Sequence, residues 1–90
     1  MSLHLLMRSQ TSDFDSWKSA FDAGAEGRGM AGLTLMQLWR EVDRPATVWA
    51  VFEVANRDKA QAFVTGPEAA ERDRRAGVTA SDWHFLETAF

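Results

Sequence analysis

Three side chains of this sequence are suited to proton transfer. Glu53 stands inside the apolar run "TVWAVFEVA" (residues 47–55), and His4 and His84 are the only histidines of the chain. Carboxylates and imidazoles are common general acids and bases, so all three are candidate catalytic residues. The alternative is structural: Glu53 would fix an interface through an ion pair, and the histidines would be hydrogen-bonded strand residues.

The sequence lacks the pattern of a metal or cofactor site. Its histidines form no HxxxH or HExxH motif, cysteine is absent, and the glycine-rich stretch follows a helix rather than a strand. We therefore expect no metal and no cofactor, so that any chemistry would depend on the chain's own side chains.

The strand that carries Glu53 has two unlike faces. Strict alternation puts Phe52 and Val54 on an uncharged face, and Trp49, Val51 and Glu53 on the other. The preceding strand is expected over residues 32–43, with "DRPA" reversing the chain.

An even-numbered loop at this reversal would bring three further side chains to the face of Glu53. These are Met36, Leu38 and Arg40. A β-bulge would exchange the two faces for one of the strands.

The elements that hold these strands form one domain over residues 1–90. Strands are expected at 3–9, 32–43, 47–55 and 81–90. A first helix carries Phe14, Trp17 and Phe21 on one face, and a second is capped by Asn56 and resumes at Pro67 until Gly77. The charge run 71–75 is expected to be a solvated helix end. This order predicts an α+β, ferredoxin-like βαββαβ plait, a four-stranded antiparallel sheet with its helices on one face.

The helix-free face of that sheet carries the candidate ligand contacts. Because an exposed apolar patch usually marks an interface, we expect a homodimer in which two such faces enclose a cavity. Arg40 could stack on Trp49, and Glu53 could pair with Arg8 or Arg40. The candidate ligand-binding residues are Trp49, Arg40, Leu38, Met36, Val51 and Arg8.

Composition narrows the range of partners. The chain is 46% hydrophobic and 26% charged, which is typical of a folded domain, and its net charge of −3 does not favour nucleic acid. Neither a membrane span nor a signal peptide is recognisable. We expect a cytoplasmic protein with no nucleic-acid or membrane partner.

The motifs "DFDSWKSAF", "DRP" and "VFEVANRDKAQAF", in this order of elements, resemble the dimeric α+β-barrel superfamily. Within it, the chain is most similar to small proteins related to antibiotic-biosynthesis monooxygenases. The resemblance spans nearly the whole chain and implies a homodimeric barrel with a pocket between sheet and helices or in the barrel interior. It places Glu53 where relatives carry an acid after an aromatic residue. Relatives often have a histidine further along, where this chain has Phe63 and Val64, and the absence of tyrosine excludes a mechanism that needs a phenol side chain.

Two functional hypotheses follow. In the first, a dimeric barrel binds a small apolar ligand in its cavity. The alternative is a cofactor-independent monooxygenase or isomerase-like enzyme acting on a small aromatic or polyketide-like substrate. In that case Trp49 would stack on the substrate, Arg40 would hold a developing oxyanion, and Glu53 or a histidine would move the proton.

Overall fold

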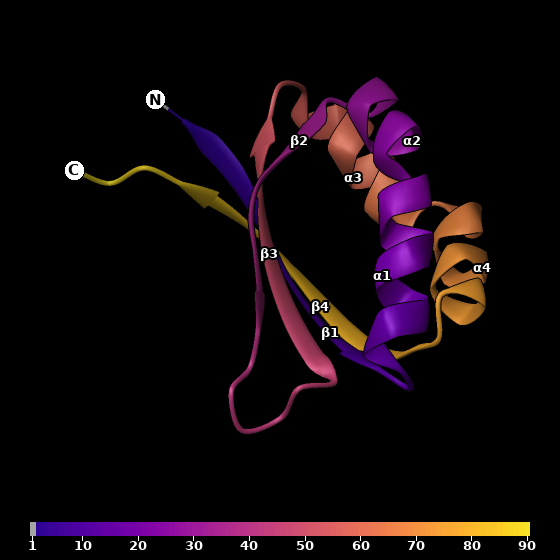
Figure 1. The fold of residues 1–90 in the computed structure, drawn as a ribbon. Coiled ribbons are helices and arrows are strands. Elements are labelled where there is room, and N and C mark those ends of the chain that lie inside the picture. The colour runs from indigo at the N-terminus through magenta and orange to yellow at the C-terminus, as the bar shows by residue number, and fades with distance from the viewer. Residues whose placement is uncertain (1) are drawn as a thin grey trace.

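The computed structural model describes residues 2–90. The four strands form one antiparallel sheet in the order β2-β3-β1-β4, and the helices cover one face of it (Figure 1). This confirms the predicted α+β, ferredoxin-like plait. The elements in chain order are β1 (Leu3–Thr11), α1 (Phe14–Ala23), α2 (Ala25–Met30), β2 (Leu33–Arg40), β3 (Thr47–Val54), α3 (Arg57–Thr65), α4 (Pro67–Arg75) and β4 (Val78–Glu87). Within the part of the chain described, every helix is too short or too polar to cross a membrane.

The core lies between the sheet and the helices. Leu5, Val48 and Phe52 are completely buried on the helix-covered face of β1 and β3. Trp17 and Phe21 meet them from α1, because their spacing of four places both on one side of that helix. Asp13 begins α1 by accepting a hydrogen bond from the Ser16 backbone N–H at 2.9 Å.

The glycine-rich segment after α1 is a helix rather than the loose connection that its composition favours. Glycine weakens a helix by about 1 kcal/mol per residue, so local propensity does not predict α2. Arg28 supplies a tertiary contact instead. Its guanidinium stacks on the Phe21 ring at 3.8 Å and donates to the Phe21 carbonyl at 2.7 Å. This contact fastens α2 against α1.

A bulge in β2 changes which of its side chains share a face. Leu35 pairs with Phe52, but Gln37 pairs with Val51, so Met36 is an extra residue between two registers. The even-numbered arrangement predicted for the hairpin is therefore wrong for Leu38 and Arg40, which lie on the helix-covered face. Gln37 and Trp39 take their places on the helix-free face.

The strand ends also differ from the prediction. β2 ends at Arg40, and β4 runs from Val78 to Glu87 rather than from 81 to 90. The start of β4 is set by Gly77, which has a φ of 75° and whose carbonyl oxygen accepts a hydrogen bond from the Ser12 N–H at 2.8 Å. A Cβ at Gly77 would lie 2.6 Å from the Ser12 hydroxyl oxygen, so the turn needs glycine.

Candidate functional site

A cavity of about 500 Å³ lies between the helix-covered face of the sheet and the four helices. Its floor comes from β1, β3 and β4, and its walls come from α1, α2, α3 and α4. Most of the side chains that line it are apolar or aromatic. Those used below are Ser9, Trp17, Phe21, Arg28, Phe52, Phe63, Ala69, Arg72, Asp73, Arg75 and Trp83.

Aromatic rings form a continuous row along this cavity. Trp17 and Phe21 stack with their ring centroids 4.7 Å apart. Phe21 in turn lies 6.3 Å from Phe52, and Phe52 lies 6.3 Å from Trp83. Such rings present wide apolar surfaces at fixed orientations, so the row is suited to contact with a flat apolar molecule.

Ser9 places a hydroxyl group in the floor of the cavity. The residue is only 2% exposed and lines the cavity. A buried hydroxyl group without a partner costs free energy, whereas a hydroxyl group open to a cavity can bond to a molecule inside it. Ser9 therefore offers a polar contact to a molecule in the cavity.

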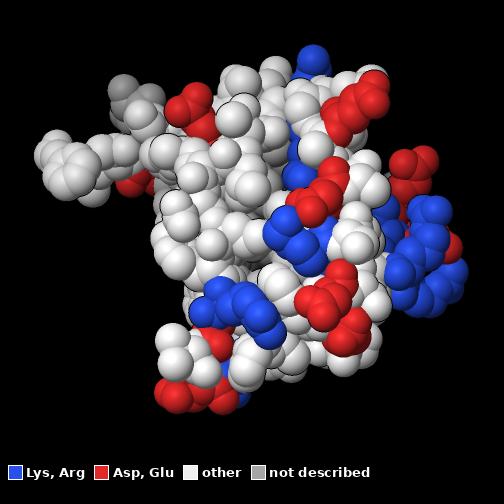
Figure 2. Space-filling view, viewed as in Figure 1, with Lys and Arg blue, Asp and Glu red and all other residues white. Residues whose placement is uncertain are grey.

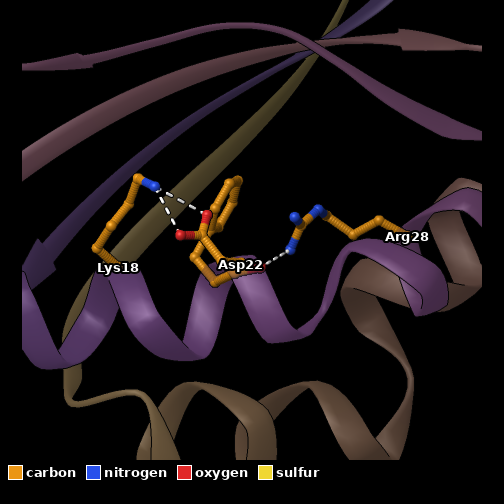
Figure 3. Close-up of polar contacts among 4 residues, drawn as sticks. Lys18, Asp22 and Arg28 are labelled. Atoms are coloured by element: carbon orange, nitrogen blue, oxygen red, sulfur yellow. Dashed lines mark hydrogen bonds and ion pairs between the residues drawn. The ribbon is translucent and has the colours of Figure 1, made fainter.

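Two arginines reach the cavity from different helices, α2 and α4, and are held in the same way. Arg28 extends back from α2 toward α1 (Figure 3). Its guanidinium group stacks there on the Phe21 ring. Arg72 of α4 lies over the Phe63 ring, with 3.8 Å between guanidinium carbon and centroid, and donates to the Phe63 carbonyl. Burial lowers the pKa of Arg28, an effect that Asp22 partly offsets. Both guanidinium groups are thus fixed in orientation at the edge of an apolar space.

Among residues 2–90, Asp73 is the only carboxylate that lines the cavity. Burial raises the pKa of Asp73, and the neighbouring Arg72 acts in the opposite direction. A carboxyl group whose pKa is higher in the folded chain binds more protons there than in the unfolded chain. The folded state is therefore destabilised, relative to the unfolded state, as the pH rises from the ordinary value of 3.8 through the raised value.

Replacing Asp73 with asparagine should remove the loss of folding stability that accompanies ionisation of Asp73. We expect the difference in free energy of unfolding, variant minus wild type, to increase with pH across that interval and to stay constant above it. Urea denaturation at a series of pH values measures it. Asp13→Asn is a control of opposite sign, because the hydrogen bond from Ser16 lowers the pKa of Asp13. A difference for Asp73→Asn that is independent of pH would contradict the assignment.

The helix-free face brings together most of the residues predicted from the sequence. Glu53 on β3 pairs directly with His4 on β1. His84 on β4 pairs with Leu6, which follows His4 by two positions on β1 and therefore lies on the same face of the sheet. Arg8 pairs with Trp49, and its guanidinium lies 5.9 Å from the Trp49 ring centroid.

The predicted ion pairs of this face are different in the structure. Arg8 forms a salt bridge with Asp82 at 2.8 Å rather than with Glu53. Within residues 2–90, Glu53 forms no ion pair with Arg8 or Arg40. Trp49 donates from its indole nitrogen to Glu41 at 2.8 Å, and this bond, with Arg44 nearby, lowers the pKa of Glu41.

Three predicted ligand contacts are not placed beside Trp49. Arg40 stacks on Phe14 at 3.9 Å and donates to the Pro45 carbonyl at 3.1 Å, so the expected stacking on Trp49 does not form. Leu38 packs against the core, and Met36 is the bulge residue. The cause in each case is the bulge, which shifts β2 by one residue relative to β3.

The apolar residues of the helix-free face form a strip across all four strands. In the space-filling view, charged side chains crowd the helical side of the molecule, and the surface over the sheet is mostly uncharged away from the hairpin (Figure 2). Trp39 and Trp49 face each other across β2 and β3. The strip consists of Leu6, Trp39, Trp49, Val51 and Leu86.

The cavity residues Ser9, Arg28, Arg72 and Asp73 were not singled out by the sequence pattern. One signal was present for two of them. Ala69, Arg72, Asp73 and Ala76 have the spacing of a single helix face, and all four are partly buried in the structure. The charge run 71–75, expected to be solvated, therefore turns three of its members toward the cavity, namely Arg72, Asp73 and Arg75. No comparable signal marks Ser9 or Arg28.

Comparison with known proteins finds similarity in structure only. No protein-family model and no curated protein matches the sequence. SnoaB from Streptomyces nogalater, a cofactor-independent oxygenase solved as a point mutant, is 16% identical with a TM-score of 0.72, over 97% of this chain and 92% of its own. A Bordetella bronchiseptica protein, provisionally named an antibiotic biosynthesis monooxygenase, gives a TM-score of 0.77 at 10% identity over 99% and 98% of the two chains.

A third structure extends the same similarity. A Chloroflexus aurantiacus protein with the same provisional name is 14% identical, with a TM-score of 0.68 over 100% of this chain and 95% of its own. At such identities the similarity shows the fold. The resemblance to antibiotic-biosynthesis monooxygenase domains is therefore confirmed for the architecture of the chain, which these proteins share along its whole length.

Proposed function

We propose that this chain binds a small, apolar, aromatic molecule in the cavity between its sheet and its helices. The observation that carries the proposal is the cavity itself, with a volume of about 500 Å³ and an aromatic row along it. Small-molecule sites typically have about 300–1,000 Å³ and are mainly apolar with a few polar groups. A ligand that binds the folded chain in this space stabilises the folded state.

The position of Ser9 favours the interpretation of the cavity as a binding site rather than as a packing defect. A defect left by imperfect packing would be lined by apolar groups alone, and it would stay dry. A hydroxyl group held in the floor among aromatic side chains is instead a group to which a ligand can form a hydrogen bond.

The proposal includes a homodimer formed through the helix-free face. The apolar strip Leu6, Trp39, Trp49, Val51 and Leu86 lies on the one sheet face that no helix covers. Packing two such strips together would remove them from water. In that dimer Glu53, His4 and His84 would lie between the two sheets and would fix their register.

Filling the cavity tests the binding function. Ala69 of α4 lines the cavity, and Ala70 beside it is exposed. We expect Ala69→Trp to weaken binding of 2-naphthamide, a neutral two-ring probe, by at least about tenfold, because the indole would occupy the space that the probe needs. Isothermal titration calorimetry measures the affinity. Ala70→Trp should leave it within about twofold, and equal binding by both variants would place the probe elsewhere.

A second function has support from the comparison with SnoaB, which is a cofactor-independent oxygenase with the same fold. In an oxygenase, proton transfer would fall to Asp73 inside the cavity or to Glu53, His4 and His84 on the helix-free face. Oxygen uptake in the presence of 1-naphthol distinguishes an enzyme from a binding protein. Uptake that Glu53→Gln or Asp73→Asn abolishes, with dimer and fold intact, would favour the enzyme and identify which face carries the chemistry.

A further inference from the structure

The three arginines that line the cavity differ in their ionic partners. Arg75 lies 3.7 Å from the Glu71 carboxylate. Arg28 and Arg72 have no carboxylate within 4.0 Å among residues 2–90. Both are only partly exposed. Asp22 acts on Arg28, and Asp73 on Arg72, without forming an ion pair, so each guanidinium group can still accept an anionic partner.

Neither arginine uses most of its hydrogen-bonding capacity. A guanidinium carries five N–H donors in a planar fork, and the side chains of Arg28 and Arg72 each donate to one backbone carbonyl, that of Phe21 and that of Phe63. The remaining donors suit a carboxylate, which accepts two parallel hydrogen bonds from such a fork.

The stacking contacts make both arginines rigid before a ligand arrives. Each guanidinium lies 3.8 Å from the centroid of a phenylalanine ring that also lines the cavity. A group that is already oriented loses little conformational freedom on binding, which favours affinity. An aromatic ligand in contact with Phe21 and Phe63 would therefore have its substituents close to the guanidinium groups that stack on these two rings.

The charged side chains that line the cavity have a net positive charge, which also favours an anionic ligand. Arg28, Arg72 and Arg75 line it together with a single carboxylate, Asp73. From the two unpaired arginines, their fixed stacking and this excess of positive charge, we infer that the ligand is an aromatic acid, with Arg28 and Arg72 binding its anionic group. This inference rests on the proposed binding function and names the class of ligand within it.

A matched pair of probes tests the inference. 2-Naphthoate and 2-naphthamide have nearly the same shape, and only the first is anionic at pH 7. We expect the wild-type chain to bind 2-naphthoate at least about tenfold more tightly, since only its carboxylate forms charge-assisted hydrogen bonds with the two arginines. Arg28→Gln and Arg72→Gln should each lower the affinity for 2-naphthoate about tenfold or more and change that for 2-naphthamide by less than about threefold. Asp73→Asn should strengthen binding of 2-naphthoate.

Arg57→Gln is the matched control. Arg57 also stacks on a phenylalanine, Phe85, at 4.9 Å, but it does not line the cavity. It should leave the affinity for both probes unchanged. If a glutamine variant does not fold, Arg28→Lys or Arg72→Lys keeps the charge without the fork and should lower the preference for 2-naphthoate.

Each outcome separates the inference from the proposed function. Equal affinity of the wild-type chain for the two probes would overturn the aromatic acid and leave the binding cavity intact. An equal loss for both probes in the arginine variants would show that Arg28 and Arg72 only fasten helices, which also overturns it. Binding of neither probe would overturn the proposed function, and the inference would fall with it.

Discussion

Replacing Phe52 with alanine is expected to lower the free energy of unfolding by about 3–5 kcal/mol. Phe52 is completely buried on β3, and its ring centroid lies 6.3 Å from those of both Phe21 and Trp83. Its removal would break the aromatic row in the middle and enlarge the cavity. Since small domains unfold at a cost of only about 5–15 kcal/mol, the variant should unfold at a much lower urea concentration. Circular dichroism measures this transition.

Phe90→Ala is the control for this substitution. Phe90 is fully exposed near the end of the chain, so the same chemical change there should alter the free energy of unfolding by no more than about 0.5 kcal/mol. If Phe52→Ala leaves too little folded protein to measure, Phe52→Leu retains most of the apolar volume and should show a smaller loss. A loss below about 1 kcal/mol for Phe52→Ala would contradict the central place of this ring.

Placing an aspartate at Val51 should convert the proposed dimer into monomers. Val51 lies in the middle of the apolar strip, paired with Leu6 on β1 and Gln37 on β2. A dimer about this face would have to bury two unpaired carboxylates, which is strongly unfavourable. We expect the dissociation constant to rise by at least about 100-fold, or about 2.7 kcal/mol. Light scattering across a dilution series, for wild type and variant, measures the mass.

Val42→Asp makes the same change at a valine that is 94% exposed in the β2–β3 connection. It should leave the dimer intact. A wild-type chain that is monomeric at every concentration would refute the interface, and with it the position of Glu53, His4 and His84 between two sheets. A dimer that survives Val51→Asp would mean that the copies meet through another surface.

The fold was predictable because its signals are periodic. Phe14, Trp17 and Phe21 repeat with the period of a helix, and the strand around Phe52 alternates strictly, so the order of the elements and the helix-covered face of β3 follow from local pattern. The bulge at Met36 was foreseeable only as an alternative. A single inserted residue leaves no mark in composition, and it reverses the assignment of Leu38 and Arg40.

The candidate site was harder to predict than the fold. Charged residues in a helix are usually solvated, so the sequence favours exposure for Arg72 and Asp73, and the packing of α4 against the sheet overrides that expectation. Arg28 belongs to a helix that local propensity does not predict at all. The residues of β3 on the helix-free face could be predicted, because Trp49, Val51 and Glu53 alternate regularly along a strand that pairs with β1 without a bulge.

The bulge at Met36 has a consequence for the divergence of this fold. Positions 37–40 owe their orientation to one inserted residue, so a single-codon deletion there would turn Trp39 toward the helices and Arg40 toward the opposite face. Such a deletion would change both the proposed contact between subunits and the contact of Arg40 with Phe14 in one step. Homologous chains that differ by one residue in this strand should therefore be aligned by sheet register, because equivalent columns can otherwise describe side chains on opposite surfaces.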